Sequence, residues 1–131
     1  MPALRRFALI AAASLGLTAC VGPFEPCDDV GNFGVKVTVV DSVSGRTPAL
    51  GSTAFLILTE GTYTETAQAS VQIANTPLVV AGALERPGTY SLEVRMTGYR
   101  DWTTTGVRVQ EEGRCDNVKT VNLTARMQQA S

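Results

Sequence analysis

The chain has 131 residues, enough for one ordinary domain, and carries 11 Lys and Arg against 12 Asp and Glu. It has no histidine, which excludes Ser-His-Asp and Cys-His catalysis and histidine-based zinc sites. The near balance of charge argues against a nucleic-acid-binding protein, because such proteins normally present a basic face.

The first nineteen residues differ in character from the rest. Arg5 and Arg6 precede an apolar stretch over residues 7–17, and small residues close it at positions 18–19. This is the layout of a secretory signal peptide, and the apolar stretch is too short for a permanent membrane span. Removal of residues 1–19 would leave 9 basic and 12 acidic residues, a net charge of −3.

The end of this segment, Leu17-Thr18-Ala19-Cys20, resembles a lipobox, the pattern at which the lipoprotein signal peptidase cuts after a diacylglycerol is attached to the cysteine. The resemblance implies lipid on Cys20, and each buried acyl CH₂ contributes about 0.8 kcal/mol, so two or three chains anchor a protein durably. The alternative is an ordinary signal peptide followed by a chance cysteine. Val21, rather than aspartate, follows Cys20, which by the familiar sorting pattern resembles outer-membrane delivery, although that pattern differs between bacterial groups.

The other two cysteines, Cys27 and Cys115, lie near the two ends of the mature chain. In an oxidising compartment such a pair is most simply a disulfide, which in the chain-entropy model contributes roughly 4 to 5 kcal/mol for so long a loop. The alternative is two thiols that bind a metal or act in redox chemistry. The absence of a Cys-x-x-Cys motif and of histidine argues against it.

Residues 20–33 form the lipidated cysteine and a short tether with no periodicity and two prolines, Pro23 and Pro26. From residue 34 to 127 apolar residues recur mostly with a period of two, which is typical of half-buried strands. The continuous apolar run 54–59 favours a strand covered on both faces.

In the first half, a strand precedes the turn 41–45, and another short strand lies at 78–81. Residues 63–71 are either an exposed strand or an irregular edge segment. In the second half the turn 86–88 is followed by strands at 90–96, 99–110 and 121–127, before a tail at 128–131. No segment has a helical period. About seven strands at this spacing predict a single antiparallel β-sandwich.

Several motifs resemble the carboxypeptidase regulatory-like domain, a transthyretin-like sandwich. Gly34–Asp41 with Ser44–Arg46 resembles its opening strand, Arg86–Val94 its Pro-Gly-x-Tyr-x-Leu-x-Val hairpin, and Gly98-Tyr99 with Gly106–Val109 the continuation. The resemblance covers residues 34–127 and implies an Ig-like or transthyretin-like fold with an accessory or interaction role and no active site. The family's Thr-Asp-x-x-Gly is absent, and the chain has Gln68–Ala74 there.

The candidate binding surface consists of two aromatic residues, Tyr99 and Trp102. Trp102 has the opposite parity to Val107 and Val109, so on a regular strand it would face outward beside Thr104. An exposed tryptophan there could stack on a sugar ring or a partner's apolar side chain. The alternative is that a bulge or bend returns Trp102 to the core or lays it over a sheet edge.

The candidate metal ligands are three aspartates, Asp28, Asp29 and Asp116, which a Cys27–Cys115 bridge would bring together as a weak calcium site. The chain has no loop with alternating acids, which makes this calcium site a weak candidate. We expect no cofactor. A Ser–Lys dyad would need Lys36 or Lys119, both at outward positions, where a solvated surface charge is the simpler interpretation.

These features predict a non-enzymatic, lipid-anchored envelope protein that binds a protein or a cell-wall glycan. One alternative is a structural subunit or edge-strand partner in a larger complex. Another is a hydrolase that works through two carboxylates facing each other across a cleft. The adjacent acids Glu111 and Glu112 lie in a predicted turn and are better explained as a polar loop end.

Overall fold

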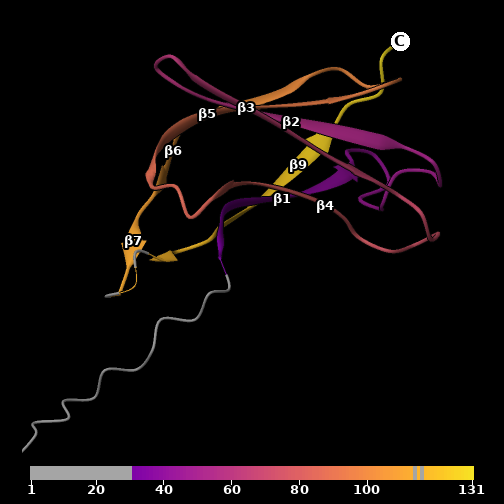
Figure 1. The fold of residues 1–131 in the computed structure, drawn as a ribbon. Helices are drawn as coiled ribbons and strands as arrows, with labels where there is room; N and C mark the ends of the chain where they lie inside the picture. The colour runs from indigo at the N-terminus through magenta and orange to yellow at the C-terminus, as the bar shows by residue number, and fades with distance from the viewer. Residues whose placement is uncertain (1–30, 114, 116) are drawn as a thin grey trace, which may run out of the picture.

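The computed structural model describes residues 31–113, 115 and 117–131. These residues form two packed β-sheets and a short separate hairpin (Figure 1). One sheet has three strands in the order β4-β1-β9, and the other has four in the order β3-β2-β5-β6. The predicted all-β sandwich is therefore confirmed.

The strands match the predicted ones closely, with small differences at their ends. Their bounds are β1 Phe33–Asp41, β2 Thr53–Glu60, β3 Tyr63–Ser70, β4 Leu78–Leu84, β5 Gly88–Met96, β6 Trp102–Val109, β7 Glu111–Glu112, β8 Asn117–Val118 and β9 Val121–Met127. The seven long strands correspond to the seven predicted ones. The short hairpin β7–β8 was not predicted, and Glu111 and Glu112 form its first strand rather than a turn.

All the strand pairs but one are antiparallel in the described residues. The exception is β1 with β9, which run parallel over seven paired positions from Val35 opposite Val121 to Asp41 opposite Met127. On its other side β1 pairs antiparallel with β4. The first and last long strands thus lie side by side, with β1 at the centre of its sheet.

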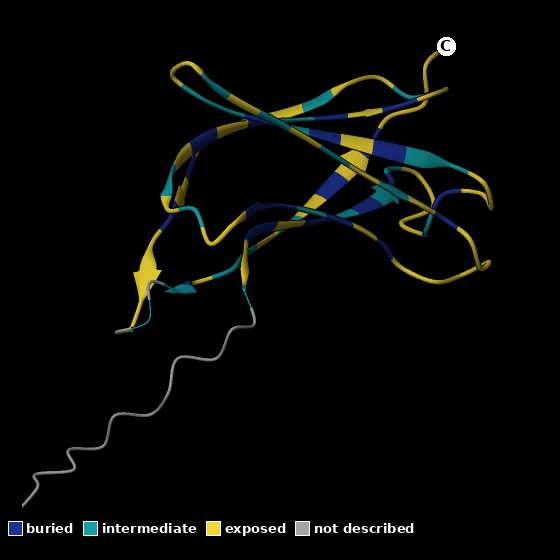
Figure 2. Cartoon of the chain, viewed as in Figure 1, coloured by how far each residue is buried: buried dark blue, intermediate teal, exposed yellow. Residues whose placement is uncertain are grey.

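The core lies between the two sheets, where the inward positions of each strand alternate with outward ones (Figure 2). Its largest members with almost no exposed surface are Tyr90, Leu56, Leu58, Leu92, Met127, Val35, Val37, Val39, Val80, Val94 and Val118. Full burial of one such aliphatic side chain contributes about 1.5 to 3 kcal/mol.

The expectation that the run 54–59 is covered on both faces is wrong. Ala54, Leu56 and Leu58 are buried, but Phe55 on the other face is 40% exposed. The reason is that β2 belongs to a two-layer sandwich, which covers only one face of each sheet. The predicted exposed segment at 63–71 is confirmed as the edge strand β3, whose alternate residues are open to solvent.

The sandwich has two distinct ends (Figure 1). We call the end where the chain enters β1 the proximal end; it also holds the β7–β8 hairpin and the turns 61–62 and 85–87. Thr120 Oγ1 donates a 2.8 Å hydrogen bond to the Phe33 carbonyl oxygen there, which ties the chain entry to the segment after β8. The opposite, distal end holds the loops 42–52, 71–77 and 97–101 and the tail 128–131.

Candidate functional site

The distal end is organised around the carboxylate of Asp41, the last residue of β1. Its side chain is nearly inaccessible, with 6% of the residue surface exposed. Oδ1 accepts hydrogen bonds from the backbone N–H groups of Val43 and Ser44, both at 2.9 Å. Oδ2 accepts from the Tyr99 hydroxyl and from Gln129 Nε2, both at 3.0 Å. One carboxylate thus joins the β1–β2 loop, the β5–β6 loop and the C-terminal tail.

These hydrogen bonds lower the pKa of Asp41 from its ordinary value of 3.8 to about 2. The largest cause is the backbone N–H of Ser44, followed by the side chains of Gln129 and Tyr99, all of which favour the charged carboxylate. The turn sequence 41–45 contains the signal for this site, since an aspartate that begins a turn accepts from backbone N–H groups two or three residues later.

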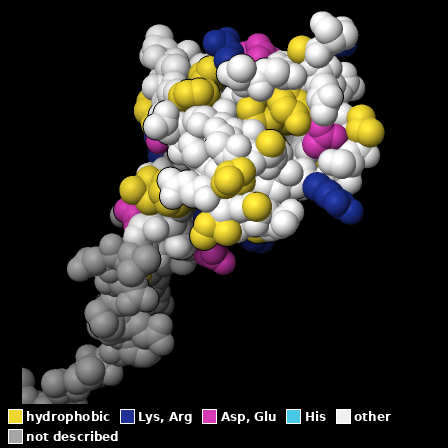
Figure 3. Space-filling model, turned by 90° about the vertical axis from the view of Figure 1, so that its right-hand side faces the viewer, with side chains coloured by type: hydrophobic (Ala, Val, Ile, Leu, Met, Phe, Trp, Pro, Cys, Tyr) yellow, Lys and Arg dark blue, Asp and Glu magenta, His cyan; other side chains and the backbone are white. Residues whose placement is uncertain are grey.

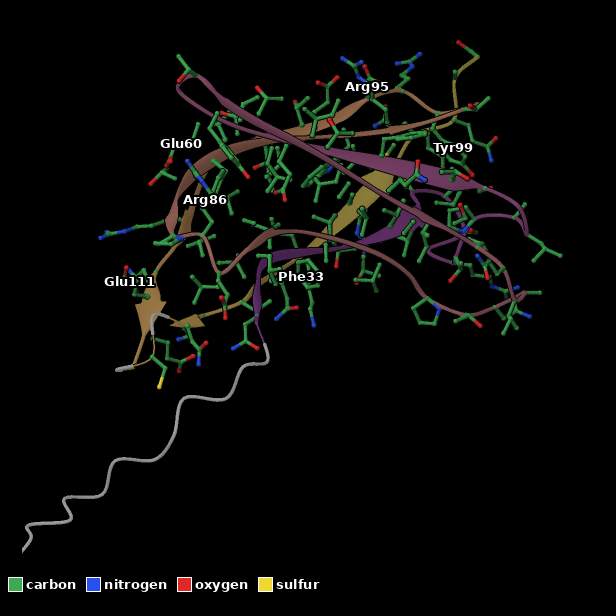
Figure 4. The ribbon with its side chains drawn as sticks, in the orientation of Figure 1. Phe33, Glu60, Arg86, Arg95, Tyr99 and Glu111 are labelled. Atoms are coloured by element: carbon green, nitrogen blue, oxygen red, sulfur yellow. The ribbon has the colours of Figure 1, made fainter. Side chains whose placement is uncertain are left out.

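Tyr99, one of the two residues of the candidate binding surface, lies at the distal end (Figure 4). Its hydroxyl donates a hydrogen bond to Asp41 Oδ2. Its ring packs against the core and is partly buried. Burial and the neighbouring carboxylate together raise the pKa of the Tyr99 hydroxyl. Tyr99 therefore holds the β5–β6 loop in place, and the donor function of its hydroxyl is used by Asp41.

Trp102 does not face outward as it would on a regular strand. The pairing of β5 with β6 shifts between Tyr90 and Leu92, where Thr105 and Gly106 together lie opposite Ser91. Gly106 takes a positive φ of 68° at this bulge.

The extra residue inverts the parity of β6, so Trp102 pairs with the buried Val94 and faces the same side as Val107 and Val109. Trp102 packs against the core and is partly exposed, because β6 is an edge strand. The alternative considered for this residue, a bulge that returns it to the core side, is the arrangement found. A glycine inside a strand pattern is the signal that indicates such a bulge.

A depression of about 230 Å³ opens beside Trp102, on the side where β6 and β9 are the edge strands of their sheets. Its walls come from three segments, and the residues are Arg100, Asp101, Trp102, Thr103, Arg126 and Gln128. Arg100 and Arg126 are isolated in the sequence and on separate segments, so nothing in the pattern of residues indicated that they share a site.

Three aliphatic side chains project from the distal loops. Val43 is 89% exposed, Leu50 63% and Ile73 70%, the three largest exposed fractions among the large hydrophobic residues described. Figure 3, which faces this end of the molecule, shows hydrophobic side chains spread over it and Lys and Arg toward its edge. Leu50 and Ile73 lie on neighbouring loops, because the backbone N–H of Gly51 donates to the Val71 carbonyl oxygen at 2.8 Å.

A shallow groove of about 400 Å³ extends from Leu50 onto the outer face of the four-stranded sheet. Phe55, Met96 and Thr97 line it together with the loop 50–53. Beyond this groove Arg95 binds Glu93 at 2.7 Å and lies 3.7 Å from Asp101, so one cation balances two carboxylates. The hydrogen bond from Arg95 is the main cause that lowers the pKa of Glu93.

The proximal end has a cluster of a different kind, in which Arg86 binds Glu60 and Tyr90 and stacks on Tyr63. The Arg86 guanidinium lies 3.6 Å from the centre of the Tyr63 ring and donates to Glu60 Oε1 at 3.0 Å and to the Tyr90 hydroxyl at 2.7 Å. Glu60 and Arg86 lie side by side in Figure 4. The backbone N–H of Thr89 is the main cause that lowers the pKa of Glu60. This cluster fastens the turn before β5.

Several sequence-predicted residues lie outside the described part of the chain. These are the lipidation site Cys20, the disulfide candidate Cys27 and the calcium candidates Asp28, Asp29 and Asp116. Cys115 is described and lies partly buried in the turn between β7 and β8. The lipid, disulfide and calcium predictions therefore stay predictions.

The two lysines are exposed as predicted, Lys36 on β1 and Lys119 just after β8. Within the described ranges there is no group of three or more Cys, Asp or Glu that could hold a metal ion. None of the residues described belongs to a helix with the length and apolar character needed to cross a bilayer.

A scan against protein-family models found no match to this chain, and a search of the curated proteins found none either. The resemblance to the carboxypeptidase regulatory-like domain stays a prediction that rests on the motifs at residues 34–46, 86–94 and 98–109.

Proposed function

We propose that this chain is a non-enzymatic envelope lipoprotein, held in the outer membrane by lipid on Cys20, which binds a protein partner with its distal end. The observation that carries the proposal is the separation of the two ends. The chain enters at the proximal end, whereas the exposed aliphatic residues Val43, Leu50 and Ile73 lie at the distal end.

A short tether would orient the two ends of the sandwich relative to the membrane. Only residues 21–32 lie between the lipidated cysteine and the start of β1, so the proximal end would face the membrane. The nine-residue strand β1 spans roughly 30 Å at about 3.3 Å per residue, and it would place the distal loops that far from the bilayer-facing end.

A disulfide between Cys27 and Cys115 would fix the tether to the body. Cys115 lies in the β7–β8 hairpin at the proximal end, where Thr120 already bonds to Phe33 at the start of β1. The bridge would therefore hold the tether close to the place where the chain enters the sandwich.

The character of the distal loops favours a protein as the partner. In the loops 42–52 and 71–77 the one charged residue is Arg46, and the nearby Asp41 is buried and fully paired. Aliphatic groups with a single cation suit an apolar partner surface with neutral or acidic surroundings, since contacts of this kind exclude water around a few anchor residues.

The experiment is photo-crosslinking of the full lipidated chain in its own envelope. A photoreactive residue replaces Leu50 or Ile73, and a matched control replaces Thr62, an exposed residue in the proximal turn. We expect the same discrete crosslinked protein from positions 50 and 73 and none from position 62. Leu50→Asp should abolish the crosslink from position 73 while the protein stays folded.

Crosslinks that arise only from position 62, or none from positions 50 and 73, would contradict the proposal. The hydrolase alternative needs two carboxylates that face each other across a cleft. The acidic pair nearest the distal end, Glu93 and Asp101, shares Arg95 as its counter-ion and gives that alternative no support. A glycan remains the second candidate ligand, and the depression beside Trp102 is the observation that favours it.

A further inference from the structure

The depression between β6 and β9 differs in chemistry from the apolar loops around it. Its lining contains two arginines, one tryptophan, one threonine, one glutamine and one aspartate, and no aliphatic side chain. At about 230 Å³ it is smaller than a typical small-molecule pocket and suits a single ring or charged group.

The two arginines reach the depression from different segments. Arg100 lies in the β5–β6 loop, and its backbone N–H donates to the Gln128 carbonyl oxygen at 2.8 Å, which holds that loop beside the tail. Arg126 lies near the end of β9. Neither guanidinium takes part in an ion pair within the described residues.

The single acid in the lining does not offset this positive charge, because Asp101 is directed toward Arg95 at 3.7 Å. Three of the remaining lining residues, Trp102, Gln128 and Thr103, have side chains that can donate hydrogen bonds. Donor groups and two cations around a small space are the complement of an oxyanion. Guanidinium groups bind carboxylate and phosphate with paired hydrogen bonds.

Trp102 adds the second element of the site. Its inner side packs on the core, and its remaining surface borders the depression at the open edge of the sheet. A partly exposed indole offers a flat apolar surface with a polar tip, on which a sugar ring can stack while its hydroxyl groups bind neighbouring amide and hydroxyl groups.

We propose that this depression, the Arg100–Arg126 site, binds a carboxylate or phosphate group carried on a sugar ring, and hence an acidic envelope glycan. The anion lies between the two guanidinium groups and the ring lies against Trp102. This site is independent of the aliphatic residues proposed to contact a protein, and the chain thereby has two separate binding features at one end.

The test uses the full lipidated protein in detergent and the fluorescence of Trp102, the one tryptophan in the chain. An oligogalacturonate tests the carboxylate source, and a mannose 6-phosphate oligosaccharide, in which the phosphate is attached to the sugar, tests the phosphate source. A neutral malto-oligosaccharide and an oligoglutamate peptide are the controls. We expect saturable binding of at least one acidic glycan that weakens with salt, and none of the neutral glycan.

Matched variants locate the site. Arg100→Gln and Arg126→Gln should each weaken binding of the acidic glycan about tenfold or more, as expected for loss of a charge-assisted hydrogen bond. Arg46→Gln, at the same end but outside the depression, should leave it unchanged. Calorimetry repeats the comparison without relying on the indole signal.

Equal losses from Arg46→Gln and Arg100→Gln would show a diffuse charge effect and overturn the site. Binding of the neutral glycan with the same affinity would show that the site does not recognise an anion. Tighter binding of oligoglutamate would assign the depression to an acidic peptide instead. Since none of these variants touches Leu50 or Ile73, failure here leaves the crosslinking result for the protein partner to stand or fall by itself.

Discussion

Asp41 shows how one residue can stabilise a whole end of the sandwich. A buried carboxylate is costly unless its oxygens are hydrogen-bonded, and here four donors from three chain segments satisfy it. Two of these bonds hold the backbone of the loop from which the exposed Val43 projects.

The first prediction concerns the pH dependence that Asp41 imposes. Its pKa in the folded protein, about 2, is below its ordinary value of 3.8. The charged form therefore stabilises the fold above about pH 4, and this contribution is lost as the pH falls toward 2. Asp41→Asn should be less stable than the natural chain at pH 7, because an amide nitrogen would meet a donor.

The measurement is the melting temperature of both proteins between pH 7 and pH 2. The difference between them should shrink as the pH falls through this window. Glu60 and Glu93, whose pKa values are also lowered, lose stabilisation in both proteins alike and so cancel in the comparison. A difference that stays constant with pH would contradict the role assigned to the carboxylate.

At the scale of elements, the strand β6 determines the orientation of Trp102 at the distal end. Its bulge at Thr105 and Gly106 turns Trp102 toward the core side and leaves Thr103 and Thr105 outward. Without the bulge, Trp102 would lie on the outer face of the sheet and the Arg100–Arg126 site would lose its aromatic wall.

The second prediction is that Gly106→Ala destabilises the protein by about 1 to 2 kcal/mol, the cost of a left-handed conformation for a residue with a Cβ. No atom lies within 4 Å of the added Cβ, so the effect comes from the backbone and not from a clash. Urea unfolding measures the change, with Thr105→Ala as the exposed neighbouring control. Equal stability of Gly106→Ala and the natural chain would show that the bulge does not need its positive φ.

The long strands could be predicted from the sequence because a strand that buries one face has apolar residues at every second position. Val35, Val37 and Val39 are an example, and all three are buried. The outward orientation expected for Trp102 on a regular strand is wrong, because a single inserted residue in β6 reverses the facing of every position beyond it. The Arg86 cluster and the proposed Arg100–Arg126 site could not be predicted from the sequence, because their members come from separate strands and loops.

At the scale of the whole molecule, the third prediction concerns the proposed disulfide. Replacement of both Cys27 and Cys115 by serine should lower the free energy of unfolding by up to about 4 to 5 kcal/mol, since the bridge would close a loop of most of the domain. Denaturant unfolding of the oxidised protein and the double variant measures the loss. Detection of two free thiols in the unreduced mature protein would refute the pairing.

The fourth prediction concerns the anchor. Cys20→Ser should prevent lipid attachment and release the protein in soluble form, whereas Cys27→Ser should stay with the detergent phase. The reason is that the proposal makes the lipid on Cys20 the membrane anchor. Phase partitioning of the two variants makes the comparison. Unchanged partitioning of Cys20→Ser would show that another feature attaches the protein.

The parallel pairing of β1 with β9 also has a consequence for the order of folding. A chain delivered from its N-terminus presents β1 early, but the neighbour that completes its sheet is the last strand, residues 121–127. Contacts of such large sequence separation form slowly and late. The sheet β4-β1-β9 therefore cannot be completed until residues 121–127 are available, although the strands of the other sheet all precede them.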